Sequence, residues 1–134
     1  KIGDFCHFEM ALKVGQEMGG HWVLGHVDGT GQVLSLNKQG EGYIFKIQVI
    51  GAFKDRFAKW VISKGSIAID GVSLTINEII DSPDSLTLSF FLIPHTVANT
   101  RFLNLEAGAL VNLEADVLGK YIERFESLKR SASL

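Results

Sequence analysis

Two histidines in a glycine-rich stretch are the side chains of this sequence best suited to proton transfer. His21 and His26 lie within residues 19–29, and an imidazole that titrates near neutral pH can act as a base. Glycine lets a ligand come close to backbone N–H and C=O groups. The stretch therefore predicts a site for a planar heterocycle, in which His26 is either functional or structural. On a regular strand, the spacing of the two histidines would turn them to opposite faces, so we expect different roles.

A second group of polar side chains lies in residues 64–75. Lys64, Asp70, Ser73 and Thr75 supply an amine, a carboxylate and two hydroxyls, and Ser73 and Thr75 share one face if this part is a strand. Covalent catalysis is not expected from this group, because its residues do not have the Ser-x-x-Lys spacing of a serine nucleophile. Asp70 precedes a glycine and suits a turn, whereas Asp116 precedes the last apolar stripe and suits a helix N-cap.

Metal and phosphate sites are not predicted. The four histidines and Cys6 show no Cys-x2-Cys or His-x3-His spacing. Residues 25–31 lack the Gly-Lys-Ser/Thr ending of a phosphate loop. We therefore expect no metal and no cofactor.

Short β-rich runs separated by Gly, Asn, Asp and Ser must position these residues. They predict a mostly β fold, a small closed barrel. The expected strands are residues 5–12, 21–36, 43–49, 66–69, 72–76, 86–93 and 109–115. Helices are expected at residues 52–62 and 96–103, the second capped by Thr96, and at the C-terminus.

The C-terminal helix is amphipathic. Its apolar stripe either packs on the barrel or serves self-association, and its last turn carries Lys129 and Arg130, which complement the helix dipole. The stripe consists of Leu118, Tyr121, Ile122, Phe125 and Leu128.

Composition indicates one folded domain. The 134 residues are 46% hydrophobic and 21% charged, with a formal net charge of -2, so nucleic acid is not an expected partner. No apolar run reaches the roughly 18 residues of a membrane span. A single cysteine and no signal peptide favour a reducing cytoplasmic compartment. Because the chain begins at Lys1 without an initiator Met, we expect a fragment or a processed product.

Four motifs together resemble riboflavin synthase. They are GGHWVLGHV at 19–27, KGSIAIDGVSLT at 64–75, LIPHT at 92–96 and VNLEAD at 111–116. The resemblance implies the second of two six-stranded antiparallel, Greek-key-like barrels, here residues 1–115, followed by a helix, residues 116–134, through which the enzyme forms homotrimers. It also implies the dismutation of two 6,7-dimethyl-8-ribityllumazine molecules to riboflavin and a ribitylamino-pyrimidinedione, without a cofactor.

The resemblance also implies roles for individual residues. His26, Ser73, Thr75, Asp70 and Asp116 are the catalytic candidates, with the two aspartates either catalytic or structural. The ring-binding candidates are Gly25, His26, Val27, Lys64, Ser73, Leu74 and Thr75. The candidates for the other edge of the site and the ribityl chain are Ile93, Pro94, His95, Thr96, Val97 and Ala98. His95 stands where a glutamate is common in the family.

The first barrel of the family is absent from this chain, and Cys6 does not match the cysteine which that barrel supplies. In the family, the active site forms between a first barrel and the second barrel of a neighbouring subunit. We therefore expect the chain to bind lumazine or riboflavin and to turn over weakly or not at all. The alternative is a non-catalytic binder of the lumazine protein type.

Overall fold

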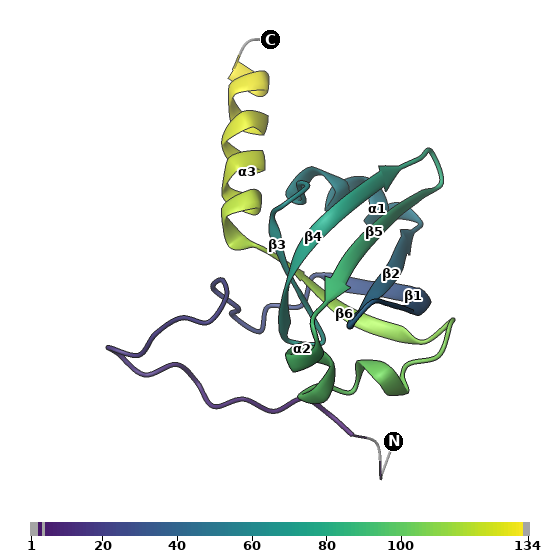
Figure 1. Ribbon diagram of the computed structural model, residues 1–134. Helices are drawn as coiled ribbons and strands as arrows, with labels where there is room; N and C mark the ends of the chain where they lie inside the picture. Colours follow the sequence, from purple (N-terminus) through teal and green to yellow (C-terminus); the bar gives the residue numbers. More distant parts are fainter. Residues whose placement is uncertain (1–2, 4, 133–134) are drawn as a thin grey trace.

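Six antiparallel strands close into a barrel in the computed structural model, which describes residue 3 and residues 5–132 (Figure 1). The order around the barrel is β1-β2-β5-β4-β3-β6, and β6 pairs with β1 to close it. Three consecutive strands, β3 to β5, stand beside β2 in a Greek-key arrangement. The predicted fold class is confirmed. The strands are β1 Gly29–Gln39, β2 Gly42–Ile50, β3 Ser66–Ile69, β4 Val72–Asp81, β5 Ser85–Leu92 and β6 Leu110–Ala115.

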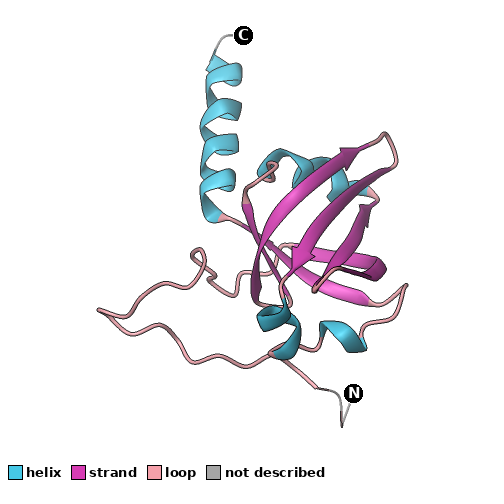
Figure 2. Ribbon diagram, in the orientation of Figure 1, coloured by secondary structure: helices cyan, strands magenta, loops and turns pink. Residues whose placement is uncertain are grey.

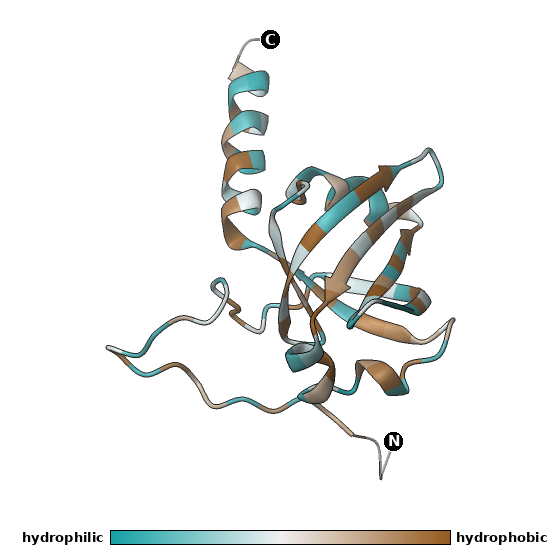
Figure 3. Ribbon diagram, viewed as in Figure 1, coloured by the Kyte–Doolittle hydropathy of each residue, from teal (hydrophilic) through white to brown (hydrophobic). Residues whose placement is uncertain are grey.

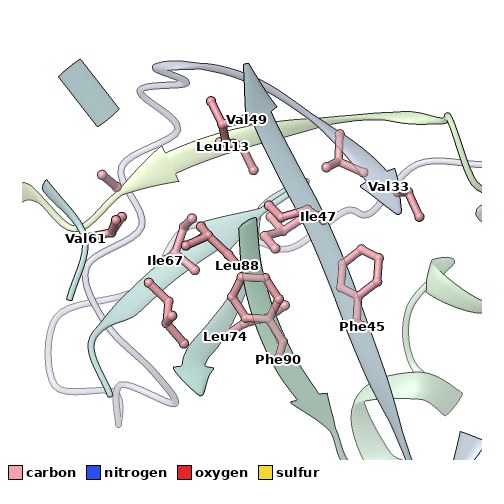
Figure 4. Close-up of a cluster of buried hydrophobic side chains, with 14 of the residues drawn as sticks. Val33, Phe45, Ile47, Val49, Val61, Ile67, Leu74, Leu88, Phe90 and Leu113 are labelled. Atoms are coloured by element: carbon pink, nitrogen blue, oxygen red, sulfur yellow. The ribbon is translucent and has the colours of Figure 1, made fainter. Parts of the chain in front are cut away.

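Alternating side chains fill the barrel. In β2, Phe45, Ile47 and Val49 are buried, while their neighbours in the strand are only partly covered, as the two-residue period of a strand requires. Figure 4 shows these three side chains in one cluster with Leu88 and Phe90 of the neighbouring strand β5 and with Leu113 of β6. Each fully buried aliphatic or aromatic side chain contributes about 1.5–3 kcal/mol. The barrel interior is therefore the hydrophobic core that stabilises the fold.

A tight hairpin joins β3 to β4. Ile69 pairs with Val72, so Asp70 and Gly71 form a two-residue turn, and both have positive φ, 46° and 82°. This combination is that of a type I′ turn, which Asp-Gly favours. The turn predicted from Asp70 and Gly71 is confirmed.

Four short helices connect the strands. The predicted helix at residues 52–62 is shorter, since α1 Ala52–Phe57 passes into the 3-10 turn η1 Ala58–Trp60. The single helix predicted at residues 96–103 is instead two short helices. The helix there, α2 Pro94–Ala98, begins at Pro94, whose fixed φ suits a first helical position, and a separate 3-10 turn follows, η2 Phe102–Asn104. Ile93, not Thr96, is the N-cap residue.

The N-terminal part of the chain contains no strand before Gly29 among the residues described. The strand predicted at residues 5–12 and the first eight residues of the one predicted at 21–36 were wrong, and Figure 2 shows both as loop. The barrel closes without these residues, because β6 pairs directly with β1. Several apolar side chains there are exposed, namely Phe5, Phe8, Met10, Leu12 and Trp22.

The C-terminal helix, α3 Val117–Ala132, projects away from the barrel (Figure 1). None of its described residues is buried, and Figure 3 shows apolar bands along it. Packing of its stripe on the barrel is therefore ruled out for residues 117–132. The helix is attached at its base, where Gly119 contacts the backbone of Trp60 and Lys120 Nζ forms a 2.7 Å ion pair with Asp28. Residues 133 and 134 of the predicted helical region lie outside the described residues.

No helix within residue 3 and residues 5–132 is both long and apolar enough to cross a membrane.

Candidate functional site

Two rows of side chains cross the outer face of β6, β3 and β4. In the first row, Ala68 pairs with Glu114 on one side and with Ser73 on the other. In the second, Ser66 pairs with Thr75. Residues two apart in a strand share a face, so all five side chains lie outside the barrel, opposite the core. Asp116 follows directly after β6 at the end of the second row.

The segment of residues 20–25 lies across the first row. At one end, the His21 Nδ1 atom lies 2.8 Å from Ser73 Oγ. At the other end, the backbone N–H groups of Leu24 and Gly25 donate to the two carboxylate oxygens of Glu114, at 2.8 and 3.0 Å. Ala68, between the two ends, is only 1% exposed. The segment therefore covers the first row and leaves the second row open.

Gly20 permits this close approach. A Cβ atom at this position would lie 2.5 Å from Ser73 Oγ, which is nearer than real Cβ contacts allow. The neighbour that Gly20 brings close is thus the protein's own β4 strand, whereas the prediction was that the glycines admit a ligand.

The main chain of β4 has an unpaired stretch beside β5. The Ile76 N–H donates to the Gly65 carbonyl and the Ile76 carbonyl accepts from the Lys64 N–H, at 2.9 and 2.7 Å, so both groups of Ile76 point toward β3. Because these directions alternate along a strand, the N–H and C=O groups of Ser73 and Thr75 point the other way, toward β5.

The ladder between β4 and β5 begins only at the pair Ile76 and Phe90, although β4 starts at Val72. Residues 72–75 therefore pair with β3 alone among the described strands. We call this stretch the β4–β5 seam. The seam presents main-chain donors and acceptors from Ser73 and Thr75 in a row, beside two exposed or half-buried hydroxyls. Such an edge is suited to a flat ligand with hydrogen-bonding groups along one side.

The helix α2 follows directly after β5, whose end flanks the seam. Ile93 is 51% exposed and Val97 is buried, so only part of the predicted 93–98 stretch is open to a ligand. Pro94, His95 and Ala98 are exposed and Thr96 is half-buried. Asn99 contacts His95, its Nδ2 donating to the His95 carbonyl at 2.8 Å.

The other predicted residues occupy two kinds of position. Gly25, His26 and Val27 lie in an exposed segment beside Glu114, two strands away from Ser73. Lys64 is exposed, next to β4 on its β3 side. Leu74 points into the core, where it is 8% exposed, so it can meet a ligand only through its main chain. The structure thus brings Ser73, Thr75 and α2 together and sets Gly25–Val27 apart from them.

Both aspartates make structural contacts. Asp70 accepts the Asn112 N–H at 2.7 Å and pairs with Arg101 at 2.8 Å. Asp116 accepts the Leu118 N–H at 3.0 Å, so its predicted N-cap position is confirmed. His26 makes no hydrogen bond with the described residues. The prediction that His21 and His26 face opposite sides of a strand was wrong, because both lie in loop.

Three residues with important contacts were not among the candidates. Glu114 lies inside the VNLEAD motif, so its acidic side chain at a strand position was the available signal. His21 was noted but given no partner. His7 accepts the Arg101 N–H at its Nε2 atom and its Nδ1 donates to the Asp70 carbonyl, both at 2.9 Å. No sequence pattern connects residues so far apart.

Two hollows lie away from this face. A groove of about 390 Å³ on β1 and β2 beside Phe53 contains none of the predicted site residues. A smaller hollow of about 230 Å³ lies between His7 and Arg101, and Asp70 is the one predicted site residue that lines it. The candidate site is therefore identified by its exposed main-chain groups and hydroxyls rather than by depth.

Two charged groups outside the site have shifted pKa values. The hydrogen bond to Asp81 raises the pKa of Lys54, whose ammonium lies 2.7 Å from that carboxylate. The hydrogen bond from Lys129 lowers the pKa of Glu126 on α3. Within residue 3 and residues 5–132, no group of three or more His, Cys, Asp or Glu side chains is arranged to hold a metal.

Comparison with known sequences shows a consistent family. The family model described as "Lumazine binding domain" matches residues 24–116. Riboflavin synthase of Photobacterium leiognathi is 35% identical over 99% of this chain and 57% of the relative. That of Bacillus subtilis is 37% identical over 92% of this chain and 54% of the relative. The chain thus spans about half the length of these curated relatives.

Solved structures show the same fold. LumP in complex with 6,7-dimethyl-8-(1′-D-ribityl)lumazine superposes with a TM-score of 0.64 at 22% identity, over 80% of this chain and 53% of LumP. LumP in complex with riboflavin gives a TM-score of 0.53 at 27% identity, over 68% of this chain and 45% of LumP. Together with the match of the family model over most of the barrel, these similarities show that the chain belongs to the lumazine-binding domain family.

Proposed function

We propose that this chain binds 6,7-dimethyl-8-ribityllumazine and riboflavin at the β4–β5 seam and the adjoining outer face. The observation that carries the proposal is the set of Ser73 and Thr75 main-chain groups that point away from β3 where β5 has not yet begun to pair. The dione edge of both rings has an N–H donor between two carbonyl acceptors. A strand edge that alternates C=O and N–H groups is complementary to it.

The rest of the ligand has partners nearby in this proposal. The ribityl hydroxyls meet the Thr96 hydroxyl and the exposed polar groups of α2, while Thr75 faces the ring from the open row and Lys64 approaches it from the β3 side of β4. His26 reaches the ligand from its exposed segment as an orienting or proton-transferring group. The LumP complexes support the choice of ligand class, because LumP has this fold and was solved with both ligands.

The test is a titration of the purified chain with each ligand, followed by ligand fluorescence. We expect saturable binding of both. A ligand methylated at the N–H of the dione edge lacks the donor, so it should bind about tenfold or more weakly. Equal affinity for the methylated and the unmodified ligand would place the ring elsewhere, and no binding of either would reject the proposal.

The proposed reaction is riboflavin synthesis, a transfer of a four-carbon unit between two lumazine molecules. The identity to riboflavin synthases supports this assignment. Two rings must be held face to face for such a reaction, and this chain offers one seam. We therefore expect binding with weak or no turnover, as measured by riboflavin absorbance in the same titration. Full specific activity of the chain would show that two copies of this barrel suffice.

A non-catalytic binder of the LumP type is the second candidate. The LumP structures favour it, because they show this fold with bound riboflavin and bound flavin mononucleotide. Mixing the chain with a full-length riboflavin synthase whose second barrel is inactivated distinguishes the two candidates, because the first barrel of that enzyme supplies a second lumazine site. The half-enzyme should restore riboflavin formation in that mixture, whereas a pure binder should not.

The proposal includes a homotrimer formed through α3. The exposed apolar residues of the helix, among them Tyr121, Ile122 and Phe125, have no cover from residues 3 and 5–132. Light scattering after size exclusion should give three times the monomer mass. Phe125→Glu should yield monomers, while Ser127→Glu, on the opposite side of the helix, should leave the mass unchanged. A wild-type monomer would reject this part of the proposal.

A further inference from the structure

Glu114 is a charged residue in a place where the sequence pattern expects a solvated side chain. It points to the outside of the barrel, yet it is only 5% exposed. Both of its carboxylate oxygens accept backbone N–H groups, one from Leu24 and one from Gly25. A buried carboxylate is costly unless such bonds satisfy it. These two N–H groups are therefore what stabilises the buried Glu114 carboxylate.

The segment that carries His26 and Val27 is held at both ends. Gly25, with a φ of 76°, is fixed by Glu114. Asp28 is fixed to β6, because its N–H donates to the Leu113 carbonyl and its carboxylate accepts the Ala115 N–H, both at 2.8 Å. His26 and Val27 between them are exposed, and Val27 is 54% exposed. Two adjacent residues between two fixed points have few alternative conformations.

We infer that Glu114 is a positioning residue for ligand binding: it holds Gly25–Val27 in the conformation that meets the ligand, without touching the ligand itself. The inference rests on the proposed function. Ordering this segment before the ligand arrives removes a conformational cost from binding. The carboxylate is required, because a glutamine in its place would turn an N–H donor toward one of the two backbone N–H donors.

Two variants separate positioning from stability. Glu114→Gln keeps the size of the side chain and removes one acceptor. Val111→Ala shortens a fully buried side chain on the same strand, so it lowers stability without changing either carboxylate contact. Riboflavin affinity by fluorescence and amide hydrogen exchange by NMR are measured for both variants and for the wild type, at a temperature where all three are folded.

We expect Glu114→Gln to weaken riboflavin binding about tenfold or more, with faster exchange of the Leu24 and Gly25 amides relative to the core. Val111→Ala should bind within about twofold of wild type. Equal affinity of Glu114→Gln and wild type would overturn the inference. Equal losses of affinity in both variants would also overturn it, since the effect would then follow stability alone.

The wild type provides a check that needs no variant. The Leu24 and Gly25 amides should already be protected from exchange in the ligand-free chain, and riboflavin should change their protection little. Rapid exchange in the free chain would overturn the inference even if Glu114→Gln failed to fold. Protected amides in a chain that binds neither riboflavin nor lumazine would instead reject the proposed function and, with it, the role of Glu114 toward a ligand.

Discussion

Replacing Gly119 by alanine tests how α3 is attached to the barrel. In an exposed helix, Gly→Ala stabilises by about 1 kcal/mol, because alanine loses less backbone freedom on folding. Here the added Cβ would lie 2.3 Å from the Trp60 carbonyl oxygen and 3.1 Å from its carbon, and real Cβ atoms essentially never come within 3.0 Å. The atoms met are backbone, which cannot rotate aside. The helix must therefore shift by about 0.7 Å at its first turn.

Such overpacking costs about 1–3 kcal/mol, and the shift also strains the ion pair between Lys120 and Asp28, 2.7 Å long. After the gain in helix propensity is subtracted, we expect Gly119→Ala to lower the free energy of unfolding by up to about 2 kcal/mol. Urea denaturation followed by circular dichroism measures it. Ser127→Ala, further along the same helix, should change stability by less than about 0.5 kcal/mol. Stabilisation by Gly119→Ala would refute the close contact between α3 and Trp60.

Three further perturbations have outcomes that follow from single contacts. The hydrogen bond to Asp81 is the main cause of the raised pKa of Lys54. This contact adds stability that is fully present below the ordinary lysine pKa of 10.5 and is lost as the pH rises through the raised pKa. Unfolding midpoints measured above about pH 10.5 should therefore fall less steeply in Asp81→Asn than in wild type. Asp70→Asn weakens the contact with Arg101, so it should lower the free energy of unfolding by about 1–3 kcal/mol and leave riboflavin affinity unchanged. A large loss of affinity at unchanged stability would instead show that Asp70 acts on the ligand. His7→Ala should speed proteolytic cleavage within residues 5–20 and leave the barrel's unfolding midpoint nearly unchanged, and unchanged cleavage would mean that the His7 contacts do not hold this segment.

Local pattern was enough to predict at least part of each strand that forms the barrel wall. The alternation of Phe45, Ile47 and Val49 predicts a half-buried strand, and it is β2. The Asp70–Gly71 pair predicts the hairpin of β3 and β4, because few residues tolerate two successive positive φ angles. Asp116 predicts the start of α3 through its side-chain oxygen. In each case the deciding interaction lies within a few residues in the sequence.

Residues before Gly29 could not be predicted in the same way. Residues 5–12 are strand-like in sequence, but a strand needs a neighbour, and β6 already pairs with β1 and β3. Likewise, the burial of Glu114 depends on Leu24 and Gly25, ninety and eighty-nine residues away in the chain. Periodicity reports which face of an element a residue occupies. It does not report which distant segment covers that face.

The proposed location of the site depends both on local sequence motifs and on contacts between segments that are distant in the chain. The sequence motifs predict the ligand class through residues that are scattered over three segments, and the barrel brings Ser73, Thr75 and α2 to one seam. The same barrel leaves Gly25–Val27 on the far side of the first row, where contacts with Glu114 and Asp28 hold them. A ligand that meets both groups must therefore extend across the open second row, over Ser66 and Thr75. In the proposed binding mode the ring system lies across this row while the ribityl hydroxyls meet Thr96 and α2, so loss of the ribityl chain should weaken binding more than loss of a ring methyl group.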